Sequence, residues 1–201
     1  GSDESGDGSA NTQSIKSFDY SKFKVPVKIR ADQLKAHLQD ALQKNQLMPI
    51  FVISGDEPLL AQEAADSVRA TARKLGFTER ETFHVEGKFD WNQVFNETSS
   101  MSLFAEKKIL ELRINNGKPG DQDSKALCEL CENLNEDNLL LVVLPKLDKN
   151  TQRSKWVKAL EANGAHIQVW PVSSEQLPKW IKQRLNLAGI NASPEAVNIL
   201  S

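Results

Sequence analysis

Short, almost wholly apolar runs separated by longer amphipathic segments are the feature that most limits what this 201-residue chain can fold into. The two strongest runs are Pro49–Ser54, which is followed by Gly55, and Leu139–Leu144. Strands this apolar are typical of a parallel sheet that helices cover on both faces. Three weaker runs complete the series, at Glu81–Val85, Lys108–Arg113 and Ala165–Trp170. The sequence therefore predicts an α/β fold with a five-stranded parallel sheet.

Helical periodicity fills the segments around these runs, and we expect each segment to be one amphipathic helix. The segments run from Asp32 to Leu42, from Leu60 to Leu75, from Trp91 to Thr98, from Gln122 to Asn133 and from Asn150 to Ala162. Parallel strands joined by such helices are expected to have right-handed crossovers. After Pro171 no strand is expected, and Ser173 or Ser174 begins a helix that passes Trp180 and ends at Gly189.

This alternation divides the chain into three parts. Residues 1–26 lack any period and begin with Gly-Ser, so we expect a leader or expression-derived segment. Residues 27–171 carry the α/β pattern and form the first domain. Residues 172–201 are purely helical in pattern, and we expect them to be the start of a second, helical domain that the chain does not complete.

Composition excludes several classes of protein. The chain is 39% hydrophobic and 26% charged with a net charge of −2, which fits neither a disordered tail nor a protein that holds nucleic acid by bulk charge. No run approaches the roughly 18 apolar residues of a membrane span, and the start does not resemble a signal peptide. The two cysteines form no disulfide framework. We therefore expect a cytoplasmic protein without a membrane partner.

The first strand, turn and helix have the layout of a phosphate-binding loop, but the residues that such a loop needs are missing. If Gly55 is its first glycine, the second glycine, the lysine and the hydroxyl residue fall on Leu60, Ala61 and Gln62. The turn carries Asp56 and Glu57, which would repel phosphate. The run Leu139–Leu144 also ends without a carboxylate for magnesium. A nucleotide-binding sheet without a functional phosphate loop is predicted; the alternative is a degenerate nucleotide-binding enzyme.

No other motif predicts chemistry. Cys128 and Cys131 have the spacing of a metal or redox pair, but none of the three histidines, His37, His84 and His166, is spaced to complete a site. Cys131 shares a helical face with apolar neighbours, so we predict a small core residue. No serine, cysteine and histidine stand in a recognisable catalytic spacing. We therefore expect no catalytic residue, metal or cofactor.

A basic run follows the fourth predicted strand. Its members are Lys146, Lys149, Arg153, Lys155 and Lys158. Such a run is usually a solvated face, and neither interleaved aromatic residues nor a strongly basic composition accompanies it. A scaffold that binds DNA directly therefore stands as an alternative function, below the others.

The stretch from Ser99 to Lys108 contains an apolar tip. Met101, Leu103 and Phe104 are large apolar residues, and polar residues flank them closely on both sides. They could be a plug that is buried in their own domain, or a handle offered to a partner, for which a few anchors carry most of the binding energy. Leucine and phenylalanine are mostly interior, so residue type alone favours the plug.

Several motifs in the order found here resemble the delta-subunit family of the bacterial DNA polymerase III clamp loader, from about Val27 to the end of the chain. The residues that carry the resemblance are Ile53–Leu60 with Gln62 and Glu63, Asp90–Asn92 with Phe95, Met101–Ala105, Leu139–Leu144 and Gln176–Trp180. The resemblance implies an AAA+/P-loop-NTPase-like fold over residues 27–171 that has lost its phosphate loop. It also implies a helical lid domain from 172 and a C-terminal collar, absent from this chain, that joins the motor subunits and delta prime.

The same resemblance favours the interpretation of the tip as a handle for a partner. It implies that Met101, Ser102, Leu103 and Phe104 insert into a hydrophobic pocket of the beta sliding clamp, with Leu103 and Phe104 as anchors, Met101 beside them and Ser102 as a spacer. The expected function is to bind the clamp and open its ring, or hold it open, for loading onto primed DNA during replication. No intrinsic catalysis is expected from this subunit of the DNA-directed DNA polymerase, a nucleotidyltransferase complex of the cytoplasmic replisome. Primed DNA is expected as a partner only in the assembled complex.

Overall fold

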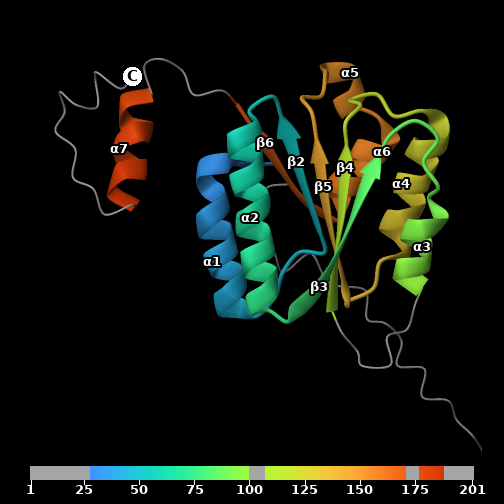
Figure 1. Ribbon diagram of the computed structural model, residues 1–201, viewed down its shortest axis with the longest axis horizontal. Helices are drawn as coiled ribbons and strands as arrows, with labels where there is room; N and C mark the ends of the chain where they lie inside the picture. Colours follow the sequence, from blue (N-terminus) through green and yellow to red (C-terminus); the bar gives the residue numbers. More distant parts are fainter. Residues whose placement is uncertain (1–27, 100–106, 171–176, 188–201) are drawn as a thin grey trace, which may run out of the picture.

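The computed structural model describes residues 28–99, 107–170 and 177–187. The first two ranges form a parallel sheet covered by helices on both faces (Figure 1). Every pair of neighbouring strands is parallel, in the order β1-β6-β2-β5-β4-β3. This confirms the predicted fold class. The strands are β1 (Lys28–Arg30), β2 (Ile50–Gly55), β3 (Phe77–Val85), β4 (Lys107–Ile114), β5 (Asn138–Leu144) and β6 (Gly164–Val169).

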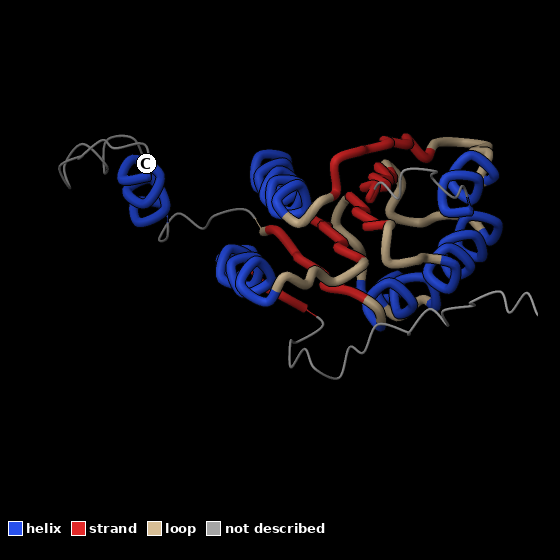
Figure 2. Tube along the Cα trace, turned by 90° about the horizontal axis from the view of Figure 1, so that it is seen from below, coloured by secondary structure: helices blue, strands red, loops and turns tan. Residues whose placement is uncertain are grey.

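The helices lie in two layers, with α1 and α2 on one face of the sheet and α3, α4 and α6 on the other (Figure 2). A 3₁₀ turn, η2 (Ala31–Gln33), precedes the first of them. Their bounds are α1 (Leu34–Lys44), α2 (Pro58–Lys74), α3 (Asn92–Ser99), α4 (Asp121–Asn133), α5 (Lys149–Gln152), α6 (Lys155–Ala162) and α7 (Leu177–Leu187). None of the described helices is long and apolar enough to traverse a lipid bilayer.

The sheet differs from the prediction in one strand and one helix. It has six strands because β1, only three residues long, pairs with β6 at the sheet edge, where Ile29 lies opposite Ile167. Three residues are too few to show a strand pattern. The helix predicted from Asn150 to Ala162 is two helices, since Ser154 has an extended backbone and is the N-cap of α6. Serine favours caps over helix interiors, because its side chain competes for backbone hydrogen bonds.

The core has two layers because the central strands are buried on both faces. On β2, Phe51 and Ile53 pack towards α1 and α2, whereas Ile50 and Val52 pack towards α4 and α6. Each fully buried aliphatic side chain of this kind contributes about 1.5–3 kcal/mol to stability. The near-continuous apolar runs of β2 and β5 follow from this double coverage.

Helix α7 is joined to α2 by a pair of charges. The guanidinium of Arg184 donates to both carboxylate oxygens of Glu63, 121 residues earlier in the chain. The guanidinium carbon also lies 4.4 Å from the centre of the Trp180 ring. The predicted boundary between a sheet domain and a helical domain near residue 171 stays a prediction.

Gly55 ends β2 at a point where no larger residue fits. Its φ is +146°, and a Cβ atom there would lie 2.2 Å from the carbonyl oxygen of Val169 on β6. The close pairing of β2 with β6 therefore requires glycine.

A Gly55→Ala variant should lose about 3 kcal/mol of unfolding free energy, because the added methyl group meets backbone that cannot move aside. Gly87→Ala is the matched control, since Gly87 also has a positive φ but open space around it. The control should lose only about 1 kcal/mol in urea denaturation. Equal losses in the two variants would show that the contact of Gly55 with β6 does not determine the cost of the substitution.

Candidate functional site

The predicted clamp-binding residues Met101, Ser102, Leu103 and Phe104 lie outside the described residues, but both flanks of their segment are described. Helix α3 leads into residues 100–106 and strand β4 leads out of them (Figure 1). The register of β4 places Lys107 opposite Phe77, at the start of β3. The segment is therefore attached to the amino edge of the sheet, the edge opposite Gly55.

One ion pair joins the two flanks directly, and two further polar contacts hold them to neighbouring parts of the chain. The Lys108 ammonium donates to the Glu97 carboxylate of α3 and lies 3.6 Å from a Glu79 oxygen on β3. The hydrogen bond to Glu97 raises the pKa of Lys108 above its usual range. The Asn135 amide donates to the Thr98 carbonyl over 3.3 Å. We call Glu97, Thr98, Lys108 and Asn135 the base of the segment.

Helix α3 is itself held against α4. The indole N–H of Trp91 donates to the Asp123 carboxylate over 2.7 Å, and the Trp91 ring packs edge-on against Phe89 at a centroid distance of 5.1 Å. Val94 is fully buried one turn later. An open depression of about 500 Å³ lies between the two helices, with Phe89 and Phe95 among its lining residues. These contacts give the base a rigid support.

At the carboxyl edge, the start of α2 is occupied by carboxylates. Glu57 is its N-cap and accepts from the backbone N–H of Leu59 over 3.3 Å. Asp56 accepts from the backbone N–H of Lys146 over 3.3 Å, and Pro58 has no N–H to offer. A phosphate here would meet two negative charges where a phosphate loop presents free N–H groups. The absence of a functional phosphate loop stays a prediction.

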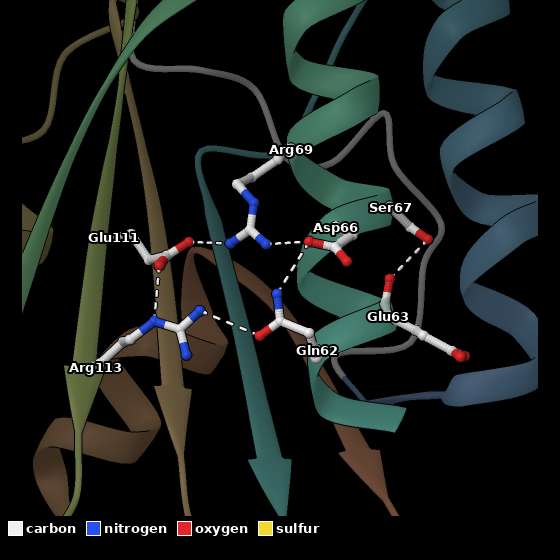
Figure 3. A network of polar contacts seen from close by, with 7 residues as sticks. All are labelled: Gln62, Glu63, Asp66, Ser67, Arg69, Glu111 and Arg113. Carbon is white, nitrogen blue, oxygen red and sulfur yellow. Dashed lines mark hydrogen bonds and ion pairs between the residues drawn. The ribbon is translucent and has the colours of Figure 1, made fainter. Parts of the chain in front are cut away.

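A polar network adjoins this edge (Figure 3). Arg69 of α2 bonds Glu111 in the middle of β4 and Asp66 on its own helix, and the Arg69 and Glu111 side chains are buried. Arg113 donates to the second Glu111 oxygen over 2.9 Å and to Gln62 over 3.4 Å. Gln62 and Arg113 also line a pocket of about 310 Å³ at the ends of β2, β4 and β5. Because Glu111 already pairs Arg113, this pocket offers no unpaired guanidinium to an anion.

The structure also assembles a serine, histidine and glutamate that the sequence did not associate. The Ser54 hydroxyl lies 2.6 Å from Nε2 of His166, and Nδ1 of His166 lies 2.9 Å from the Glu161 carboxylate. A carboxylate only accepts, so Nδ1 of the neutral ring carries the proton and Nε2 accepts from Ser54. His166 is 0% exposed and Ser54 3% exposed. A substrate cannot reach these three residues, which link β2, β6 and α6 in the core and which we call the buried relay.

The two cysteines are half-buried, so Cys131 lies at the margin of the core and not inside it as predicted. Both pack against the core from α4, and burial raises the pKa of Cys131 to about 12. Such a thiol is almost wholly protonated near neutral pH and a poor nucleophile. Within the described ranges, no group of three or more histidine, cysteine or acidic residues is arranged to hold a metal ion.

Comparison with known proteins identifies the family. The family model described as "DNA polymerase III, delta subunit" matches residues 51–169, more than half of the chain. The chain belongs to the DNA polymerase III delta subunit family. The delta subunit of Escherichia coli is 30% identical over 174 residues, and that of Haemophilus influenzae is 31% identical over 176 residues. These matches cover 87% and 86% of this chain and 49% of each relative, so the chain spans about half the length of these delta subunits.

Solved structures support the fold. The Bacillus subtilis DNA clamp loader delta protein superposes with a TM-score of 0.59 at 16% identity, covering 82% of this chain and 51% of that one. Thermotoga maritima RuvB superposes with a TM-score of 0.51 at 14% identity, covering 83% and 52%. At these identities the likeness establishes the fold alone. It confirms the AAA+-like fold expected of this delta-family chain.

The tip stays a prediction of the sequence, whereas its base was not predicted. Nothing in the spacing of Glu97 and Lys108 predicts their bond, because helix α3 and strand β4 must first be placed side by side. Sequence reasoning also missed an aromatic neighbour of the basic run, since the Lys146 ammonium lies 5.9 Å from the Trp170 ring centre. The charged residues that recur through Lys107–Arg113 were the only feature of the sequence to indicate that one face of β4 carries polar side chains.

The buried histidines predict a stability that falls in mild acid. Burial lowers the pKa of His166, partly offset by Glu161, and burial likewise lowers the pKa of His37. Below about pH 6.5 the unfolded chain binds protons that the folded chain does not, so the free energy of unfolding decreases as the pH falls. Urea denaturation should show a loss of about 1–2 kcal/mol between pH 7.5 and 5.5.

Replacement of His166 isolates its contribution to the pH dependence of the free energy of unfolding. A His166→Gln variant should keep less of this pH dependence than the wild type, whereas His84→Gln, which alters an exposed side chain of β3, should keep all of it. An unchanged pH dependence in the His166 variant would contradict the assignment of a neutral His166 in the folded chain.

Proposed function

We propose that this chain is the clamp-binding portion of a clamp-loader delta subunit. It binds the beta sliding clamp through Met101, Ser102, Leu103 and Phe104 and opens the ring, or holds it open, for loading onto primed DNA. Membership of the delta subunit family supports this role. The collar that would join the motor subunits and delta prime is proposed to lie in the part of the relatives that this chain does not span.

The observation that carries the proposal is the base of the segment. Lys108, Glu97, Thr98 and Asn135 tie both flanks of residues 100–106 to the sheet through described contacts. A partner that binds the apolar residues between these flanks would pull on α3 and β4 together. A pull on the segment, or a change in its orientation, would therefore be transmitted to the whole sheet. This suits a subunit that must hold a partner in one geometry.

The proposed mechanism is differential binding. A bound protein shifts a conformational equilibrium only by the difference between its affinities for the two states. If the tip and its base fit the open ring better than the closed ring, binding favours the open ring without covalent chemistry. Leu103 and Phe104 are the proposed anchors, and Met101 packs beside them near the subunit interface of the clamp.

Truncation of both anchors tests the proposal. A well-buried anchor contributes about 2–4 kcal/mol, or roughly 30- to 1000-fold in affinity. The Leu103→Ala/Phe104→Ala variant should therefore lose measurable binding to the sliding clamp of the same organism in isothermal titration calorimetry. Leu59→Ala is the control, because Leu59 is a large apolar residue, 51% exposed, at the carboxyl edge. It should bind the clamp normally.

Thermal unfolding followed by circular dichroism distinguishes the two ways in which the proposal can fail. If the double variant is unfolded, the two residues belong to the core of their own domain, as the plug interpretation holds. A folded double variant with normal affinity would place the clamp contact elsewhere. Saturable, stabilising binding of ATP with magnesium would favour the alternative of a degenerate nucleotide-binding enzyme.

A further inference from the structure

One exposed stretch of the chain is strongly basic although the whole chain is not. Residues 146–158 contain five cations and a single carboxylate, Asp148, whereas the net charge of the chain is −2. All five cations are exposed. They are Lys146 after β5, Lys149 on α5, Arg153 between the helices, and Lys155 and Lys158 on α6. The positive charge is therefore concentrated in one short, largely exposed part of the chain.

The carboxylate of this stretch does not neutralise it. Asp148 is the N-cap of α5 and accepts from the backbone N–H of Thr151 over 2.6 Å, the main reason that the pKa of Asp148 is low. Its second oxygen lies 3.6 Å from the ammonium of Lys118, which adds a sixth cation to the surface. Among the described residues, no carboxylate forms an ion pair with any of the five cations of the stretch.

An exposed tryptophan lies at one end of this surface. Trp170 follows β6 and is 55% exposed, and the Lys146 ammonium is 5.9 Å from the centre of its ring. Helix α5 is held beside the same strand, since Gln152 contacts Gln168 over 3.5 Å and Lys28 over 3.5 Å. The aromatic ring and the cations come from separate parts of the sequence and meet at the carboxyl edge of the sheet.

We propose that this surface, the basic edge, binds single-stranded nucleic acid. It consists of Lys118, Lys146, Lys149, Arg153, Lys155, Lys158 and Trp170. Phosphates would follow the cations of α5 and α6, and one base would stack on the Trp170 ring, which every base can do without sequence preference. A duplex hides its base faces, and an acidic protein needs no exposed ring, so the pairing of Trp170 with Lys146 favours a single strand over both.

The basic edge and the clamp-binding segment do not compete. The basic edge lies at the carboxyl end of the sheet, around β5 and β6, whereas the base formed by Glu97 and Lys108 lies at the amino edge. Both surfaces can be occupied at once, and the failure of either proposal leaves the other standing.

Fluorescence anisotropy tests the proposal with a labelled oligothymidylate of about 16 nucleotides, a length within the range that single-strand sites cover. The wild-type chain should bind with a Kd between about 1 and 100 μM in 50 mM salt, and the affinity should fall steeply as salt rises. Lys149→Gln/Arg153→Gln should reduce the salt slope by about 1.4 and the affinity at 0.1 M salt by about 25-fold. Trp170→Ala should weaken binding by about 5- to 150-fold.

The control removes the same charge from the opposite layer of helices. Lys35→Gln/Lys74→Gln changes exposed lysines of α1 and α2 and should keep both the affinity and the salt slope within about twofold. Absence of binding at low salt would overturn the proposal, as would equal weakening by the control. If polyglutamate binds as tightly as the oligonucleotide and Trp170→Ala affects neither, the basic edge is a surface for acidic proteins and the proposal is wrong.

Discussion

Strand β4 is held in register between β3 and β5, and the positions of the candidate surfaces depend on that pairing. Its first residues carry Lys108, which belongs to the base, and its middle carries Glu111. Glu111 and Arg69 are buried partners, and each has a second partner, since Arg113 also pairs Glu111 and Asp66 also pairs Arg69. A slip of one residue would turn Glu111 to the opposite face of the sheet, away from Arg69. The ion pair therefore fixes the register of β4.

That register also places the two edges of the sheet at opposite ends of β4. The carboxyl edge is where sheets of this kind bind their ligands, yet here Asp56 and Glu57 already accept from the backbone N–H groups of Lys146 and Leu59. The amino edge carries the segment that we propose to bind the clamp. A delta-family chain can therefore retain the AAA+-like sheet as a rigid frame while its proposed contact with a partner lies at the edge away from the phosphate-loop position.

The sequence was sufficient for features that depend on local pattern. The apolar runs of β2 and β5 predicted a doubly covered parallel sheet, which the structure confirms. Short elements and interruptions were missed, as with the three-residue β1 and the cap at Ser154. Long-range pairings were not predictable either. Ser54 and His166 are 112 residues apart, and only the pairing of β2 with β6 brings them together.

The candidate site shows the same division. The residue types of Met101, Leu103 and Phe104 marked an apolar tip, but residue type alone favoured burial, and the resemblance to the delta family supplied the interpretation as a handle. The base was invisible in the sequence because Glu97, Lys108 and Asn135 lie on three separate elements or connections. Trp170 was assigned to a strand, and its exposure beside Lys146 became apparent only once β6 was seen to end at Val169.

Hydrogen–deuterium exchange of this chain with and without the sliding clamp tests the central claim most directly. We predict that the clamp slows exchange in peptides that cover residues 95–108, which include the tip and three of the four residues of its base, and leaves peptides around Gly55 and the start of α2 unchanged. Slowed exchange at the carboxyl edge, with none between residues 95 and 108, would contradict the account.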